Sequence, residues 1–174
     1  MDYIWVQEAA KDIGQLEIKG DKNNPVIVDA IDWADGKNDD KNLQGIRNDD
    51  IPWCSSWLCG KFEQAGIQSP RTAWAQGWAP WGQKLTGPAV GCVVVFRWSA
   101  SAGHVGIVMG KNAAGNLMVL GGNQADAVNV KAFGTGQVLA YRWPTGYDLP
   151  AVVGLKNLPV VTGDNAVTKF SETR

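Results

Sequence analysis

Apolar residues in the first third of the chain recur every three or four positions, the period of a helix with one buried face. Gly14 ends the first such run. Asn24 followed by Pro25 is typical of a helix start, because asparagine caps free backbone N–H groups and proline suits the first helical position. The pattern predicts three helices, over residues 3–13, 25–34 and 52–65.

Three tryptophans, Trp74, Trp78 and Trp81, follow the third predicted helix at spacings of four and three. The spacing predicts a short fourth helix over residues 72–81, distorted near its end by Pro80. Such a stripe usually packs into a core, although aromatic faces also bind sugars and peptides. Trp78 is therefore a candidate substrate contact.

After Pro88 the pattern changes to runs rich in β-branched residues, which are typical of strands. Five strands are predicted, over residues 92–97, 104–109, 117–120, 127–130 and 138–143. Their short connections favour antiparallel neighbours. Helices followed by strands predict an α+β fold, with the amino-terminal helices packed on a five-stranded antiparallel sheet. We expect one domain over residues 1–144 and a carboxy-terminal extension over residues 145–174, which show no clear period.

Composition and charge narrow the function classes. The 174 residues are 45% hydrophobic and include nine tryptophans, so the chain can bury a sizeable core. A formal net charge of −1 argues against a protein that binds nucleic acid through its overall charge. Residues 64–147 carry one acid and six bases. This local excess suits a substrate with carboxylates, although strands and turns that lack acids would give the same balance.

Cysteine usage and the amino terminus bear on the compartment. Three cysteines cannot form a complete disulfide framework, so synthesis in a reducing compartment is expected. No basic segment followed by an apolar one opens the sequence, and no run reaches the roughly 18–20 apolar residues of a membrane span. We expect synthesis in the cytoplasm without a signal peptide, and delivery by another component if the protein acts elsewhere.

The candidate chemistry centres on Cys54 and the single histidine, His104. Cys54 lies near the start of the third predicted helix, where free N–H groups favour a thiolate and can hold an oxyanion. The preceding Asp49 and Asp50 would oppose thiolate formation unless they point away. His104 begins a strand next to Gly103, which leaves room for a substrate or a facing helix. A cysteine nucleophile needs a base, and His104 is the only imidazole available.

A third polar group is expected to hold the far nitrogen of His104. If the strands on either side of residues 110–116 pair as a hairpin, Asn123 comes close to His104. Asp126 is the competing candidate, and Gln124 is a candidate oxyanion donor. The same residue types also occur in ordinary turns.

Metal chemistry is less well supported by the pattern. Three cysteines and one histidine match a zinc ligand count, but Cys54 and Cys59 share one helix on diverging faces, unlike the close pairs of structural zinc sites. Residues 35–42 are rich in Asp and Asn, but Lys37 stands where a calcium loop needs an oxygen ligand. No metal or cofactor is expected. Cys59 and Cys92 are expected in the core.

Three motifs carry a resemblance to a known family. Pro-Trp-Cys-Ser-Ser-Trp at residues 52–57, Gly-His-Val-Gly-Ile-Val at 103–108 and Leu-Gly-Gly-Asn-Gln at 120–124 resemble, in this order, the CHAP and NlpC/P60 superfamily of papain-like peptidases and amidases. The similarity covers about residues 5–144 and looks like a subgroup carried by phages and bacteria. It implies a papain-like fold with Cys54 as nucleophile, His104 as base and Asn123 as the third residue. Many relatives carry Glu-x-Asn where this chain has Gly-Gly-Asn, so the acidic member is missing.

The resemblance implies cleavage of an amide bond in peptidoglycan, either within the stem peptide or between N-acetylmuramic acid and L-alanine. We expect Trp53, Gly103, Gln124 and Trp78 to contact the substrate. A phage lysin or an antibacterial effector of this kind would act in the periplasm or cell wall of the target bacterium. An effector would also need a secretion component and a cognate immunity protein. The alternative is a non-catalytic module of this fold that binds wall glycans or peptides.

Overall fold

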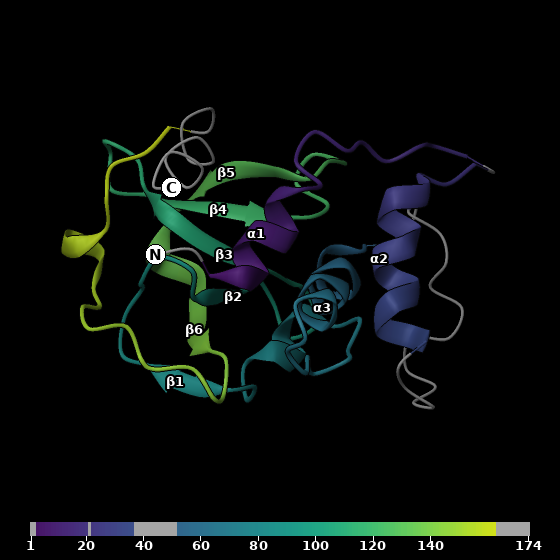
Figure 1. Ribbon diagram of the computed structural model, residues 1–174. Coiled ribbons are helices and arrows are strands. Elements are labelled where there is room, and N and C mark those ends of the chain that lie inside the picture. The colour runs from purple at the N-terminus through teal and green to yellow at the C-terminus, as the bar shows by residue number, and fades with distance from the viewer. Residues whose placement is uncertain (1–2, 21, 37–51, 163–174) are drawn as a thin grey trace.

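The computed structural model describes residues 3–20, 22–36 and 52–162. Within them the chain forms three α-helices and one six-stranded antiparallel sheet, which confirms the α+β fold. Helix α1 (Ile4–Ala10) lies over the sheet, α3 (Cys54–Gln64) lies beside it, and α2 (Pro25–Gly36) packs on the outer side of α3 (Figure 1). In the part of the chain that is described, every helix is too short or too polar to cross a bilayer.

Local sequence explains how α2 starts and how closely it approaches α3. Asn24 Oδ1 accepts the Val26 N–H at 2.9 Å, as the Asn-Pro pattern predicts. A Cβ atom on Gly60 of α3 would lie 1.8 Å from the Ala30 carbonyl oxygen of α2. Glycine at position 60 therefore lets the two helix backbones touch.

The sheet has the strand order β1-β6-β2-β3-β4-β5. The strands are β1 Gln83–Leu85, β2 Val93–Arg97, β3 Gly103–Lys111, β4 Leu117–Gly121, β5 Asn129–Phe133 and β6 Val138–Trp143. The sequence pattern did not predict β1, because three residues are too few to show an alternation. The strand predicted at residues 127–130 begins two residues later, as β5.

The sheet curls strongly. β3 and β4 lie between β2 and β5 in the sheet order, so β2 and β5 would be about 14 Å apart in a flat sheet. The rings of Phe96 on β2 and Phe133 on β5 nevertheless have centroids only 5.1 Å apart. The His104 ring on β3 lies 5.2 Å from that of Phe133. The curl therefore gathers side chains from three strands around His104.

Tryptophan side chains fill much of the core. The fully buried ones are Trp5, Trp53, Trp57, Trp78 and Trp143. The predicted helix over residues 72–81 is wrong, since only a short 3₁₀ turn forms there, η1 (Ala75–Trp78). Gly77 and Pro80 both disfavour a longer helix. Trp78 is buried whereas Trp74 is half exposed, so the predicted tryptophan stripe is not one continuous surface.

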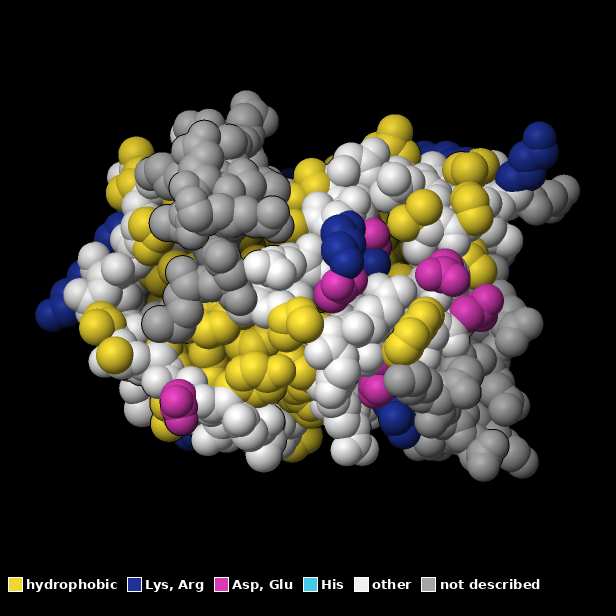
Figure 2. Space-filling model, in the orientation of Figure 1, with side chains coloured by type: hydrophobic (Ala, Val, Ile, Leu, Met, Phe, Trp, Pro, Cys, Tyr) yellow, Lys and Arg dark blue, Asp and Glu magenta, His cyan; other side chains and the backbone are white. Residues whose placement is uncertain are grey.

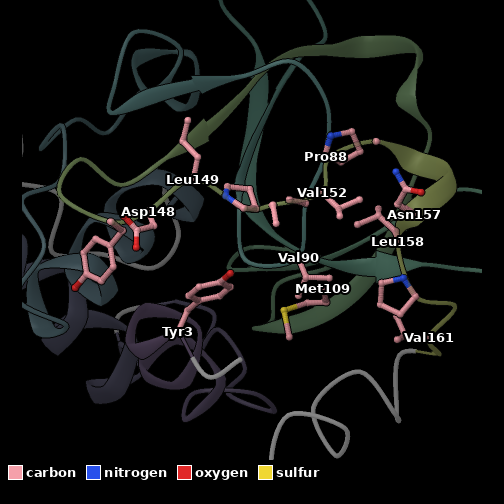
Figure 3. A pocket seen from close by; sticks show the side chains of 16 residues that line it. Tyr3, Pro88, Val90, Met109, Asp148, Leu149, Val152, Asn157, Leu158 and Val161 are labelled. Carbon is pink, nitrogen blue, oxygen red and sulfur yellow. The ribbon is translucent and has the colours of Figure 1, made fainter.

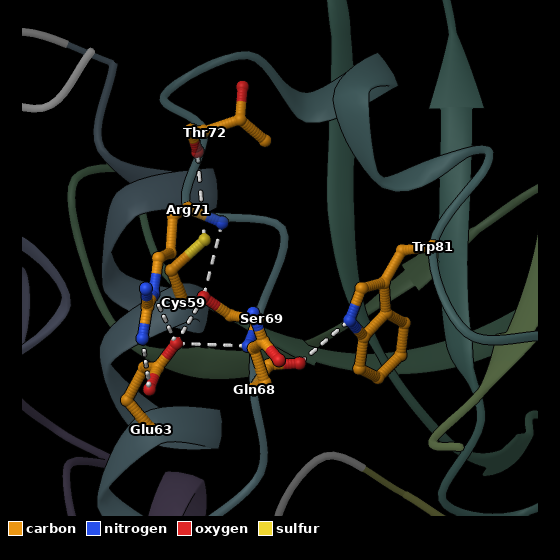
Figure 4. Close-up of polar contacts among 7 residues, drawn as sticks. All are labelled: Cys59, Glu63, Gln68, Ser69, Arg71, Thr72 and Trp81. Carbon is orange, nitrogen blue, oxygen red and sulfur yellow. Dashed lines mark hydrogen bonds and ion pairs between the residues drawn. The ribbon is translucent and has the colours of Figure 1, made fainter. Parts of the chain in front are cut away.

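The second half of α3 is tied to the segment that follows it (Figure 4). Glu63 accepts hydrogen bonds from the Ser69 N–H at 3.0 Å, the Ser69 hydroxyl at 3.1 Å and Arg71 Nε at 3.0 Å. Burial would raise the pKa of Glu63, but these hydrogen bonds and the Arg71 charge together lower it. Cys59 is fully buried beside this network, with its Sγ 3.6 Å from the Thr72 carbonyl oxygen, which confirms it as a core thiol.

Residues 144–162 run back over the domain after β6. Val160 forms a parallel bridge with Lys111 at the end of β3, and Lys111 Nζ donates to the Leu155 carbonyl oxygen at 3.0 Å. An apolar cavity of about 780 Å³ lies between this segment, Tyr3 and Met109 (Figure 3). Figure 2 shows a broad hydrophobic patch on the face that carries α1 and β6.

Candidate active site

Cys54 is the first residue of α3, two positions nearer the helix start than the sequence pattern predicted. Only 7% of the residue is exposed. Burial raises the pKa of its thiol to about 11, although backbone hydrogen bonds from Val105, Ser55 and Cys54 itself act in the opposite direction. Burial therefore opposes the expected thiolate, because the loss of hydration outweighs the backbone hydrogen bonds.

The hydrogen bond with Val105 places the Cys54 thiol at the start of β3, where His104 is the preceding residue in the chain. His104 is the second residue of β3 and is only 4% exposed. Antiparallel pairing sets it directly opposite Phe96 on β2. Its ring lies nearly parallel to that of Trp98, with centroids 6.0 Å apart. The Cys54 thiol and the His104 ring thus both lie at the start of β3.

His104 is held through its Nε2 atom, which lies 2.9 Å from Gln124 Oε1. Gln124 Nε2 donates to the Val119 carbonyl oxygen at 3.1 Å, the Asn129 carbonyl oxygen at 2.8 Å and Asn129 Oδ1 at 2.9 Å. Because an amide nitrogen only donates, these oxygens determine which end of the Gln124 amide meets the histidine. Nε2 of neutral His104 therefore carries the proton, and Nδ1 keeps a lone pair that can accept one.

The environment also keeps the histidine neutral. Burial lowers the pKa of His104 below its ordinary value, the hydrogen bond with Gln124 acts against this, and the charge of Lys131 adds to the lowering. The raised pKa of Cys54 and the lowered pKa of His104 both favour the neutral forms of the two side chains. A neutral ring with a free nitrogen is the form that a general base requires.

Gln124 is the hydrogen-bond partner of His104 Nε2, whereas the sequence predicted Asn123 in this position. The hairpin on which that prediction depended does form, with Ile107 opposite Leu120. If the same pairing continued for three more residues on each strand, His104 would lie opposite Asn123. β4 ends two residues before Asn123, however. The turn that follows carries Gln124 to the ring instead.

The turn after β4 has an uncommon backbone. Three of its non-glycine residues have φ values of 54° to 58°, in the left-handed region: Asn123, Ala125 and Asp126. Each such residue costs about 1–2 kcal/mol, so surrounding contacts have to hold the turn in place. The Gln124 N–H donates to the Ala127 carbonyl oxygen at 3.0 Å. The Asp126 carboxylate, the competing candidate, pairs instead with Lys19 at the surface.

Two glycines make room for this arrangement. A Cβ atom on Gly121 would lie 2.8 Å from Gln124 Oε1 and 3.3 Å from His104 Nε2. A Cβ atom on Gly122 would lie 2.4 Å from the Trp53 ring. The acidic residue that the family resemblance led us to expect would fall at Gly121, where a side chain would displace the end of Gln124. Its absence thus goes together with the use of Gln124 as the partner of His104.

The predicted substrate contacts differ in their exposure. Trp53 and Trp78 are fully buried and Gln124 is 2% exposed, so none of the three presents a surface to a substrate. Trp78 Nε1 donates to Ser55 Oγ at 3.0 Å, inside the core. Gly103, at the start of β3, is partly exposed and stays a candidate contact.

Two aromatic residues at the site were missed by the sequence reasoning. Trp98 is 50% exposed beside the His104 ring, and Phe133 is partly exposed next to the same ring. A signal for Trp98 was present, because it lies two positions after Phe96 and strand alternation puts both on one face. Phe133 had no such signal, since only the curl of the sheet brings it to His104.

Other candidate groups lie away from this pair or outside the described residues. Asp49 and Asp50 fall outside them, as does most of the loop predicted at residues 35–50. Among residues 3–20, 22–36 and 52–162, no three His, Cys, Asp or Glu side chains gather in a possible metal site. Cys92 is fully buried, as expected for a core thiol.

Comparison with known proteins bears on this pair. A family model for the CHAP domain matches residues 46–123. The match contains Cys54 and His104 and ends one residue before Gln124. A search of curated proteins found no significant match. Residues 46–123 are therefore similar to the CHAP domain, which the cysteine and histidine motifs also resemble and which is in general a peptidoglycan hydrolase of the amidase or peptidase type.

Proposed function

We propose that this protein cleaves an amide bond of peptidoglycan by thiol chemistry, with Cys54 as nucleophile and His104 as base. The observation that carries the proposal is the fixed tautomer of His104. Gln124 Oε1 accepts a hydrogen bond from Nε2 at 2.9 Å, which leaves Nδ1 as the basic atom of a ring whose chain neighbour, Val105, hydrogen-bonds to the Cys54 thiol. Gln124 is a positioning residue in this proposal and takes the role first assigned to Asn123.

The proposed reaction has two stages. His104 Nδ1 takes the Cys54 proton as the sulfur attacks the substrate carbonyl carbon, and the Cys54 N–H at the start of α3 helps to hold the oxyanion. The C–N bond then breaks as His104 gives its proton to the leaving amine, and a thioester remains. Water, deprotonated by His104, attacks the thioester. The C–S bond breaks, the carboxylate product leaves, and the sulfur recovers its proton.

The pKa directions define when the thiolate forms. Because the pKa of Cys54 is about 11 and that of His104 is lowered, proton transfer is unfavourable before substrate binds. The proton therefore moves together with carbonyl attack, when the developing negative charge passes to the oxyanion site. The active form of the free protein is the neutral pair.

Loss of the nucleophile tests this proposal. Cys54→Ala should abolish clearing of purified peptidoglycan while leaving the thermal unfolding midpoint close to that of the parent. Cys92→Ala removes a buried thiol outside the site and serves as the matched control, so its folded fraction should keep the parent rate. Mass spectrometry of the released muropeptides would identify the bond cut. A Cys54→Ala protein that clears the wall at the parent rate contradicts the mechanism.

The setting that we propose is attack on the wall of a target bacterium, as a phage lysin or as an antibacterial effector with a cognate immunity protein. The test is expression in a bacterium with and without an added export signal. Lysis should require both export and an intact Cys54, because the substrate lies outside the inner membrane. Equal toxicity of the non-exported form would point to a different target.

Fewer observations support the alternative, a non-catalytic module that binds the cell wall. It relied on the tryptophan stripe, and the full burial of Trp78 interrupts that stripe. A hydrogen-bonded His104 and a thiol at the same strand start have no evident purpose in a module that only binds. Binding of Cys54→Ala to insoluble peptidoglycan would still measure any affinity that is separate from cleavage.

A further inference from the structure

Glu17 contacts two parts of the candidate site that are far apart in sequence. It lies in the segment between α1 and α2, outside the residues that match the CHAP model. Its Oε2 atom accepts the Trp53 indole N–H at 3.1 Å, and its backbone N–H donates to the Asp126 carbonyl oxygen at 2.8 Å. One residue therefore joins the start of α3 to the turn after β4.

The first contact of Glu17 is with Trp53, the residue directly before α3 and Cys54. It is the residue that caps α3, its carbonyl oxygen accepts the Trp57 N–H at 2.9 Å, and Cys54 follows directly. The Trp53 ring is fully buried against Gly122. A buried indole N–H without an acceptor is unfavourable, so removing the Glu17 carboxylate should shift the ring and the residue after it.

The second contact of Glu17 is with the strained turn that carries Gln124, which the same segment holds. The Gly14 N–H donates to the Val128 carbonyl oxygen at 2.9 Å, and Leu16 and Ala127 form an antiparallel bridge. Glu17 is the last residue of this short ladder. The ladder supports a backbone that is unfavourable by itself, and the Gln124 side chain must leave that backbone in the right direction to reach the histidine.

We propose that Glu17 is a positioning residue that sets the distance between the Cys54 thiol and the His104 ring. Its carboxylate holds the residue before the nucleophile, and its backbone holds the turn that orients the base through Gln124. The proposal depends on the proposed thiol mechanism for its catalytic meaning. The hydrogen bond that it invokes can be measured without turnover.

Three variants separate this role from a purely structural one. Glu17→Ala removes the bond to the indole and leaves the backbone bond to Asp126 intact. Glu17→Gln keeps an oxygen that can accept the indole N–H. Glu8→Ala is the control, since Glu8 is a carboxylate on α1 that pairs with Lys11 at the surface. Each would be assayed for kcat and KM on soluble muropeptides, for thermal unfolding, and for hydrogen exchange of the Trp53 indole N–H by NMR.

We expect Glu17→Ala to lower kcat by roughly tenfold with KM within about twofold, because small misplacements of reacting groups reduce chemistry more than binding. The indole N–H should exchange faster in this variant. Glu17→Gln should recover most of kcat and the slow exchange, and Glu8→Ala should match the parent. An unchanged kcat or exchange rate in Glu17→Ala, or an equal loss in Glu17→Gln, overturns the proposal. If Cys54→Ala shows that the thiol mechanism is wrong, the exchange measurement still reports whether Glu17 holds Trp53.

Discussion

Gln124 Oε1 accepts a hydrogen bond from His104 Nε2 at 2.9 Å, so the partner of the histidine is an uncharged amide. A carboxylate in the same place would stabilise the imidazolium, whereas an amide orients the ring without adding charge. Burial keeps the pKa of His104 below its ordinary value, even though the hydrogen bond with Gln124 acts to raise it. The protein should therefore keep its base in the active, neutral form at mildly acid pH.

Replacement of Gln124 by glutamate tests this relationship. In Gln124→Glu the added negative charge raises the pKa of His104, so the ring is protonated at a higher pH. The acid limb of the kcat/KM profile should move up by about one pH unit or more. The profile on soluble muropeptides and an NMR titration of His104 measure this. A Gln124→Glu protein with the parent pH profile would show that Gln124 is not coupled to the base.

The buried thiols make a prediction about alkaline stability. Burial raises the pKa of Cys54 and Cys59 to about 11 and that of Cys92 to about 12. In the unfolded chain the same thiols ionise near pH 8.5, so the unfolded state loses protons first as the pH rises. The free energy of unfolding should be greatest below about pH 8.5 and should fall as the pH rises toward 11. Chemical denaturation between pH 7 and 10.5 measures the slope, and Cys59→Ala should reduce it.

Gly121 and Gly122 lie where even a methyl side chain would contact neighbouring atoms closely. Gly121→Ala places a Cβ atom 2.8 Å from Gln124 Oε1, so it should displace the partner of His104 and lower kcat strongly. Gly122→Ala places one 2.4 Å from the buried Trp53 ring, so it should also destabilise the fold by about 1–3 kcal/mol. Gly134→Ala is the matched control, because the nearest atom would be 4.0 Å away. Equal activity of all three would show that the turn is not tightly packed.

Trp98 offers a test of the substrate side. Its ring is half exposed and lies nearly parallel to that of His104, so it can contact a substrate at the reacting bond. Trp98→Ala should lower kcat/KM on peptidoglycan by about tenfold or more, since an aromatic contact contributes on the order of 1–2 kcal/mol. Trp74 is equally exposed but lies on another segment, and Trp74→Ala should have little effect. Equal rates for the two variants would remove Trp98 from the site.

Part of the fold could be read from local patterns alone. The Asn24 cap and the strand over residues 138–143 appear in the structure as predicted. These features depend on neighbours in sequence, which is why the chain itself reveals them. The helix predicted over residues 72–81 is wrong because its tryptophan spacing reflected burial of Trp78 rather than a helical backbone.

The candidate pair was also visible in the sequence, since a cysteine at a helix start needs a base and His104 is the only histidine. Its protonation state was not visible. The helix start predicted a thiolate, but the thiol is buried and its pKa is raised to about 11. Burial depends on what packs over a residue, and that is a property of the whole fold.

The sequence by itself thus determined which residue types could do the chemistry and that they lie on a helix start and a strand start. Only the tertiary structure decided that Gln124, and not Asn123, orients His104, and that Glu17 joins the two halves of the site. The reason is geometric. A left-handed turn redirects the chain after β4, and no spacing rule for strands or helices describes where such a turn leads.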